Sequence, residues 1–207
     1  MAARAVDRTL GPVPMKRLLA LVAAGIMLAM THAPTAAETA GAFDHDFQAI
    51  EGGRMPLAQW RGKVLLVVNT ASFCGYTRQY EGLQALWGRY REKGLVVIGV
   101  PSNDFGAQEP KAESEIQAFC QGAFGVTFPL TTKEVVKGAA AHPFYRWAGA
   151  ALGAANAPRW NFHKYLVGRD GRLIAGYGSA VEPLSAELTK AIEAALAAPA
   201  LRPATKN

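Results

Sequence analysis

The sequence predicts an α/β protein with a mixed central sheet, because buried-strand patterns alternate with helical patterns before a later hairpin. The runs KVLLVVN at 63–69 and LVVIGV at 95–100 are continuously apolar and rich in β-branched residues. Such runs are typical of strands buried on both faces. Between them, apolar residues recur at helical spacing from Thr77 onward, and Gly94 stands where a helix would end. This order of elements places the chain in the α/β class.

The elements around these two strands are shorter. Before the first strand, alternating apolar and polar residues around Gly52 and Gly53 predict an N-terminal β-hairpin. After the second strand, a loop beginning at Pro101 leads to a helix expected at about 113–121. The run VTFPL at 126–130 then indicates a short strand segment.

The last third of the chain predicts two helices and a second hairpin. A proline opens the helix expected in HPFYRWAGAAL at 142–152. The stretch WNFHKYLVGRDGRLIAGYG at 160–178 is typical of a hairpin whose turn is 168–171. A final helix begins near Pro183. The whole order suits a thioredoxin-like fold, with a mixed central sheet, flanking helices and an N-terminal β-hairpin.

Residues 1–37 have the layout of a secretory signal. Two basic residues follow Met15, which is a possible start, and an uncharged apolar core fills 18–30. Small residues follow, so cleavage is expected after Ala37. The alternative is an uncleaved anchor, but the apolar core is shorter than the roughly 20 residues that span a bilayer. We therefore expect an exported, periplasmic protein without stable membrane insertion after cleavage.

The remaining chain predicts one domain at 38–200 and a flexible tail at 201–207. A chain of 207 residues with 50% hydrophobic and 18% charged residues lies in the globular range. The formal charge of +6 is partly carried by the signal, and the other basic residues are scattered singly. Nucleic acid is therefore not an expected partner. The four histidines show no metal-ligand spacing with either cysteine, so neither a metal nor a cofactor is expected.

Cys74 raises the main functional question. It lies just beyond a central strand and shortly before a helix, where open α/β sheets place ligands and where helix amides favour a thiolate. The position of Cys74 in the sequence leaves three roles open: a buried packing residue, half of a structural disulfide with Cys120, or a nucleophile. A dithiol motif is excluded because Thr77 stands where its second cysteine would be.

Five blocks of the chain resemble, in order and spacing, the signature blocks of the glutathione peroxidase family. They are NTASFCGYTRQYEGLQALW, VPSNDFGAQEP, FGVTFPL, HPFY and WNFHKYLVGRDG. The resemblance covers roughly residues 42–197. It implies a thioredoxin-like fold and reduction of hydroperoxides at a cysteine assisted by glutamine, tryptophan and asparagine. The matching positions are Cys74, Gln108, Trp160 and Asn161.

The chemistry agrees with these residue types. A thiolate that attacks a peroxide needs hydrogen-bond donors around the sulfur and around the departing oxygen. Gln108 and Asn161 offer amide N–H groups and Trp160 offers its indole N–H, and none of the three titrates. Taken singly, Trp160 has an ordinary alternative as a core aromatic, and the two amides have one as loop polar residues.

Cys120 is the one internal thiol that could resolve a Cys74 sulfenic acid. Its place resembles that of the second working cysteine in the thioredoxin-dependent branch of the family, and Ser102 occupies the position of another cysteine found in relatives. The alternative is that Cys120 only packs in the core. Joining two sulfurs requires Cα atoms within ~7 Å, so we expect the helix at 113–122 to unwind during turnover.

The sequence thus predicts an exported thiol peroxidase that reduces hydrogen peroxide or organic hydroperoxides and is recycled by a thioredoxin-like protein. Two rivals remain: a glutathione-dependent peroxidase in which Cys120 is dispensable, and a non-catalytic exported binding module with a structural disulfide. Arg78 and His163 depart from the family pattern and change the charge near the expected site. The segment between FPL and HPFY is short and lacks the extra loop that some tetrameric relatives use for assembly, so the family resemblance implies a monomer or weak dimer.

Overall fold

The computed structural model describes residues 41–199, so the expected signal at 1–37 and the expected tail at 201–207 lie outside the described residues. A four-stranded sheet of order β4-β3-β5-β6 forms the centre. Its strands are β3 (Val64–Thr70), β4 (Leu95–Pro101), β5 (Lys164–Val167) and β6 (Leu173–Tyr177). β3 runs parallel to β4 and antiparallel to β5, and β5 and β6 are antiparallel, so the predicted mixed sheet is confirmed.

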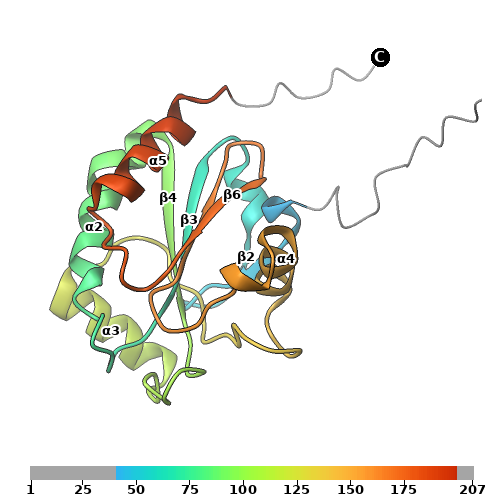
Figure 1. Cartoon of the computed structure of the whole chain (residues 1–207). Coiled ribbons are helices and arrows are strands. Elements are labelled where there is room, and N and C mark those ends of the chain that lie inside the picture. The colour runs from blue at the N-terminus through green and yellow to red at the C-terminus, as the bar shows by residue number, and fades with distance from the viewer. Residues whose placement is uncertain (1–40, 200–207) are drawn as a thin grey trace, which may run out of the picture. The chain divides into compact units, whose positions relative to one another are not determined.

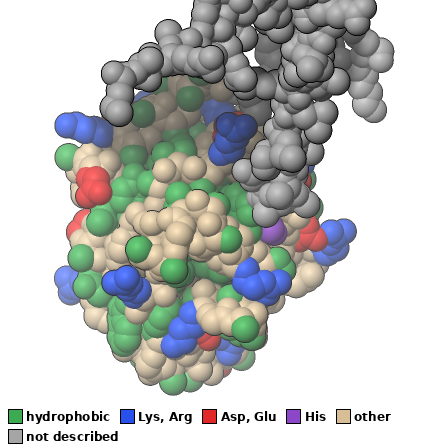
Figure 2. Space-filling model, turned by 45° about the vertical axis from the view of Figure 1, so that its right-hand side comes forward, with side chains coloured by type: hydrophobic (Ala, Val, Ile, Leu, Met, Phe, Trp, Pro, Cys, Tyr) green, Lys and Arg blue, Asp and Glu red, His purple; other side chains and the backbone are tan. Residues whose placement is uncertain are grey.

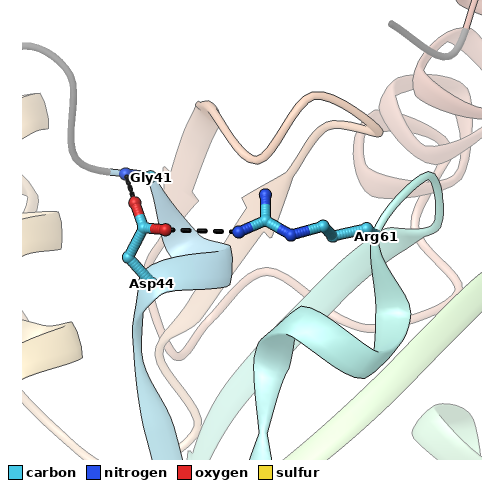
Figure 3. Close-up of polar contacts among 3 residues, drawn as sticks. All are labelled: Gly41, Asp44 and Arg61. Atoms are coloured by element: carbon cyan, nitrogen blue, oxygen red, sulfur yellow. Dashed lines mark hydrogen bonds and ion pairs between the residues drawn. The ribbon is translucent and has the colours of Figure 1, made fainter. Parts of the chain in front are cut away.

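The predicted N-terminal hairpin is also present. It consists of β1 (Asp46–Gln48) and β2 (Arg54–Pro56), and two short 3₁₀ helices flank it, η1 (Ala42–Asp44) and η2 (Leu57–Trp60). Figure 3 shows how Asp44 joins these flanks, since its carboxylate accepts from the Gly41 N–H at 2.9 Å and from the Arg61 guanidinium at 3.3 Å. Asp44 of η1 thereby links the residue before η1 to the residue after η2.

The helices cover both faces of the sheet. They are α2 (Gln79–Tyr90), α3 (Glu113–Phe124), α4 (Pro143–Leu152) and α5 (Ala186–Ala197), with the short 3₁₀ helices η3 (Arg91–Lys93) and η4 (Ala154–Asn156). In Figure 1, α2, α3 and α5 lie on one side of the sheet and α4 with β2 on the other. β3 supplies both cores by alternation: Leu66 and Val68 pack toward Tyr80, whereas Leu65 and Val67 pack toward Phe144.

Local sequence signals explain where these helices begin and end. Pro143 occupies the first turn of α4, where its missing N–H costs nothing. The Ser185 hydroxyl accepts from the Leu188 N–H and caps α5. Gly94 follows η3 with φ 103°, a left-handed conformation that favours glycine.

The strand segment predicted at 126–130 is wrong. Only an isolated parallel bridge joins Leu130 to Gly99 there. The Gly99 N–H donates to the Pro129 carbonyl, and the Thr131 N–H donates to the Gly99 carbonyl. Because Pro129 has no N–H of its own, the segment meets the edge of β4 at one residue and does not extend into a strand.

The surface agrees with the dispersed charge of the sequence. On the face drawn in Figure 2, blue Lys and Arg side chains lie apart from one another among tan and green atoms. A bilayer-spanning helix, which needs both length and continuous apolarity, is not found within residues 41–199.

The turn between β5 and β6 generates a stability prediction. Gly171 has φ 83°, and a Cβ there would lie 2.7 Å from the ring of the buried Phe43, whereas Gly62 has φ 81° and open space around it. We expect Gly171→Ala to lower the free energy of unfolding by about 2–4 kcal/mol through backbone strain plus overpacking, and Gly62→Ala by about 1–2 kcal/mol through strain alone. Urea denaturation measures both, and equal losses would contradict the ring contact.

Candidate active site

Cys74 lies half-buried in the tight turns that join β3 to α2. The Tyr76 N–H points at its sulfur, with 3.4 Å between N and Sγ. The Thr77 hydroxyl accepts from the Cys74 N–H and donates to the Ala71 carbonyl, both at 3.0 Å. These bonds fix the loop, and the Tyr76 N–H provides the sulfur with one main-chain hydrogen-bond donor.

Gln108 and Asn161, which are far apart in sequence, are in direct contact. The Asn161 amide nitrogen donates to Gln108 Oε1 at 3.0 Å and to the Phe105 carbonyl at 3.5 Å. Asn161 is fully buried and Gln108 is half-buried. The main-chain carbonyl of Gln108 accepts from the Phe73 N–H at 3.0 Å. This pair of amides is therefore joined to the residue that precedes Cys74.

Trp160 lies beside the same group of residues. Its ring centroid is 5.9 Å from that of Phe105. The Asn69 side chain donates to the Trp160 carbonyl at 3.1 Å, and the Phe162 N–H donates to the Asn69 carbonyl at 2.6 Å. The side chain is 39% exposed, which does not fit the alternative of a buried core aromatic. Its indole is accessible to solvent beside the predicted donors.

Backbone strain is concentrated next to the two amides. Among residues 41–199, the non-glycine residues with positive φ are Ala107 at 51° and Phe162 at 63°. Each is the chain neighbour of a predicted site residue, Gln108 in one case and Asn161 in the other. Left-handed conformations cost energy in residues with a Cβ, and they are enriched at sites whose function fixes the backbone.

The structure thus brings Gln108, Trp160 and Asn161 together around Phe105. The main chain of Gln108 contacts Phe73, the residue that precedes Cys74. That these donors bind the sulfur itself stays a prediction. The half-buried Cys74 lies in a loop that is hydrogen-bonded, through the Phe73 N–H, to the segment that carries Gln108. Within residues 41–199, no three His, Cys, Asp or Glu side chains gather as a metal site requires.

Cys120 lies in the core on the inner face of α3 and has no exposed surface. Burial raises the pKa of its thiol to about 11, against a smaller opposing effect of a hydrogen bond with Tyr80. Both cysteines are free, so the structural disulfide expected for a binding module is not formed. In this conformation Cys120 is a neutral, inaccessible thiol.

Lys111 links the Cys74 loop to α3. Its ammonium lies 5.1 Å from the ring centroid of Phe73 and 4.8 Å from that of Phe119. Phe73 precedes Cys74 and Phe119 precedes Cys120, so one cation contacts the neighbours of both thiols. Cation–π contacts of this kind are attractive, and here they hold the Cys74 loop against α3. A bond between Cys74 and Cys120 would require these two segments to move.

Sequence reasoning missed a buried carboxyl next to the site. Glu109 has no exposed surface, accepts from the Ser72 hydroxyl at 3.0 Å, and donates its N–H to Asn103 Oδ1 at 2.8 Å. Burial raises the pKa of Glu109, and the hydrogen bonds from Ser72 oppose this. The bond to Ser72 ties the Gln108 loop to the Cys74 loop a second time. The only sequence signal was an acidic residue inside the quoted block GAQEP.

A second missed residue is Lys164, the first residue of β5. It has no exposed surface, and its ammonium donates to the Gln79 side chain and to the Phe162 carbonyl. In HKYLV the lysine only precedes an apolar strand run, which does not show that its side chain is buried.

Arg78 and His163, the two departures that change the charge near the expected site, each line a cavity. Arg78 lines a cavity of about 400 Å³ together with Tyr76 and Glu182. His163 lines another, of about 250 Å³, together with Trp160. The first cavity thus includes chain neighbours of Cys74, and the second includes Trp160 itself.

Comparisons with known proteins identify the family and the fold. The glutathione peroxidase family model matches residues 42–148. The hydroperoxy fatty acid reductase of Synechocystis sp. is 45% identical over 152 residues, which are 69% of this chain and 90% of that protein. A glutathione peroxidase-like peroxiredoxin of Schizosaccharomyces pombe is 44% identical over 135 residues, 64% of this chain and 85% of that protein. The crystal structure of Trgpx in apo form has a TM-score of 0.64 and 34% identity, and covers 78% of this chain and 98% of that one.

Fold and relatives together define the class of protein, a peroxidase with a thioredoxin-like fold. The chain belongs to the glutathione peroxidase family. The predicted fold and the predicted enzyme class are both confirmed.

His163 generates a prediction about acid stability. Burial, with a smaller effect of the neighbouring Lys164, lowers the pKa of His163 from 6.5 to about 4. As the pH falls below 6.5 the unfolded chain takes up this proton before the folded one, so the folded state loses stability until about pH 4. The side chain is 6% exposed, and the loss from this one group is on the order of 3 kcal/mol. We expect the free energy of unfolding, measured by urea denaturation, to fall less steeply between pH 6.5 and about pH 4 in His163→Gln than in the wild type. Equal slopes in the two proteins would contradict the prediction.

Proposed function

We propose that the chain is an exported, periplasmic thiol peroxidase in which Cys74 reduces hydrogen peroxide or organic hydroperoxides, Cys120 resolves the product, and a thioredoxin-like protein restores both thiols. Export rests on the signal pattern of residues 1–37. A monomer or weak dimer is proposed from the short segment before HPFY. The observation that carries the catalytic proposal is the Gln108–Asn161 pair joined to the Cys74 loop through Phe73.

The first step transfers one oxygen atom to sulfur. The Cys74 thiolate attacks a peroxide oxygen, an S–O bond forms and the O–O bond breaks. Sulfur is oxidised to a sulfenic acid, and the peroxide is reduced by two electrons to water or an alcohol after the leaving oxygen takes a proton. Neutral donors near the sulfur stabilise charge on the attacking and departing atoms.

The donors have different parts in this step. Asn161 gives its amide nitrogen to Gln108 Oε1 and to the Phe105 carbonyl. With Oε1 so engaged, the Gln108 amide nitrogen is directed away from Asn161 and is available to the sulfur or to the peroxide. We assign Gln108 and the exposed indole of Trp160 as donors, and Asn161 as the residue that orients Gln108 in this conformation.

The second step requires α3 to open. The Cys120 thiolate attacks the Cys74 sulfenic sulfur, the S–S bond forms, and hydroxide leaves and is protonated to water. A buried thiol with a pKa of about 11 does not provide this thiolate, so α3 must unwind and the Lys111 contacts to Phe73 and Phe119 must break. Gly125 ends the helix with φ 61°, and its N–H bonds to the Cys120 and Gln121 carbonyls, so these capping bonds must also break when the helix unwinds from this end.

The reductant separates two versions of this function. A thioredoxin-like protein would reduce the Cys74–Cys120 disulfide, whereas glutathione would act on the sulfenic acid and leave Cys120 dispensable. Because a relative is named a hydroperoxy fatty acid reductase, fatty acid hydroperoxides belong among the organic substrates to be tested.

Cysteine variants test the proposed cycle. We expect Cys74→Ser to abolish peroxide consumption, because the thiol that attacks the peroxide is removed and the remaining Cys120 is buried with a raised pKa. We expect Cys120→Ser to consume about one equivalent of peroxide and then stop with thioredoxin as reductant, because the sulfenic acid is not resolved. Coupled assays with thioredoxin and with glutathione measure turnover.

Three outcomes contradict parts of this cycle. Full turnover of Cys120→Ser with glutathione would favour the glutathione-dependent version. Absence of a Cys74–Cys120 crosslink in mass spectra of the peroxide-treated wild type would exclude the resolving role. Loss of stability on reduction, without peroxide consumption, would instead favour the binding module.

Removal of the proposed donor tests the amide pair. We expect Gln108→Ala to slow oxidation of Cys74 by about 10²- to 10³-fold, because a preorganised donor to the developing charge is lost. Stopped-flow mixing of the reduced protein with hydrogen peroxide measures this rate. The matched control is Gln84→Ala, which removes a half-buried glutamine that bonds to Thr127 outside the site. Equal rates for the two variants would contradict the assignment of Gln108.

A further inference from the structure

Lys164 is a fully buried cation whose contacts join two parts of the candidate site. It begins β5, between Val68 of β3 and Tyr177 of β6. Its ammonium donates to Gln79 Oε1 and to the Phe162 carbonyl, both at 2.7 Å. Buried lysines are rare because removing the charge from water is costly, so a lysine retained here with two close acceptors indicates a specific role.

The first acceptor belongs to the element that follows Cys74. Gln79 is the first residue of α2, and its N–H donates to the Tyr76 carbonyl within the turn that also holds Cys74. The Gln79 amide nitrogen donates in turn to the Ser179 carbonyl at 2.7 Å and to Glu182 Oε1 at 3.2 Å. Lys164 thereby anchors the start of α2 through a chain of bonds that ends on a carboxylate.

The second acceptor belongs to the turn that carries the predicted donors. Phe162 follows Asn161 and has the left-handed φ of 63°. Its N–H is held by the Asn69 carbonyl and its carbonyl by the Lys164 ammonium, so both of its peptide groups are fixed. A strained backbone conformation persists only where surrounding contacts hold it in place. The charged hydrogen bond from Lys164 is one of the contacts that hold Phe162.

We infer that Lys164 is a positioning residue of the peroxidase, whose buried ammonium holds the Trp160–Phe162 turn against the first turn of α2 and so sets the donors relative to Cys74. This role rests on the function proposed above. Lys164 has no exposed surface and is not proposed to contact the peroxide.

The protonation of Lys164 makes this role measurable. Burial lowers the pKa of Lys164 to about 8, and the carboxylate of Glu182 opposes this. The groups that face it are Gln79 from α2, Glu182 from the segment before α5, and Tyr177 from β6, with the neutral His163 beside it in the chain. Above about pH 8 the amine is neutral, and its hydrogen bonds lose the strength that a charged donor gives.

The experiment compares Lys164→Met and Lys164→Arg with the wild type over about pH 6 to about pH 10 in stopped-flow oxidation of Cys74. We expect Lys164→Met to be slower by about 10- to 100-fold at neutral pH, because small displacements of catalytic groups have effects of this size. We expect the wild-type rate to fall above about pH 8 relative to Lys164→Arg, whose guanidinium stays charged. The matched control is Arg169→Met, which removes a cation bound to the Gly62 and Leu196 carbonyls.

A second measurement does not depend on activity. In the full chain labelled with fluorotryptophan, with the Trp160 signal assigned by Trp160→Phe, we expect that signal to titrate near pH 8 in the wild type and not in Lys164→Met or Lys164→Arg. A Trp160 signal that is the same in wild type and both variants across this range would overturn the positioning role, as would wild-type oxidation rates and pH profile in the variants. If Lys164→Met does not fold, the comparison of Lys164→Arg with the wild type across the same pH range still tests the positioning role. A Trp160 signal that responds to Lys164 in a protein whose Cys74 does not react with peroxide would support the positioning role and refute the proposed function.

Discussion

The candidate site depends on how the buried end of β3 holds the turn that carries Trp160 and Asn161. Asn69 is the residue before the last residue of the strand, and it binds this turn through its main chain and its side chain. Its main-chain carbonyl accepts from the Phe162 N–H, and its side-chain amide donates to the Trp160 carbonyl. The same strand leads directly into the Cys74 loop. One strand thus sets the position of Cys74 and of the turn that carries Trp160 and Asn161, as a preorganised site would require.

The polar groups buried around this strand form a connected support. Asn161 orients Gln108, the hydroxyl of Ser72 binds Glu109, and the ammonium of Lys164 binds Gln79. Burial of such groups is unfavourable unless they are hydrogen-bonded, and their partners here come from different elements. The segments of the site are therefore held together by polar contacts at the end of the sheet, while the apolar residues of β3 hold the two layers of helices.

The sequence predicted most of the fold because its long strands are continuous apolar runs and its helices begin and end at recognisable residues such as Pro143 and Gly94. It failed at 126–130, where an apolar, β-rich run contains Pro129 and therefore pairs at one residue only. Position along the chain placed Cys74 correctly between strand and helix. No spacing rule joins Gln108 to Asn161, so their association came from the family resemblance.

What the sequence did not predict are interactions that tertiary structure alone creates. A lysine in a strand is usually exposed, and nothing local indicates that Lys164 faces the interior and finds two acceptors there. Lys111 is one of many scattered cations until the fold places Phe73 and Phe119 on either side of it. Such contacts depend on the angle at which distant segments meet, which periodicity does not encode.

The complete burial of Cys120 has a consequence for chemical selectivity. The chain contains two identical functional groups, and the fold alone makes them unequal, since one thiol is accessible and the other is enclosed with its proton retained. An electrophile or oxidant that arrives from solution therefore reaches one sulfur and not the other. Burial shields the second thiol from the irreversible oxidation that an exposed cysteine can undergo.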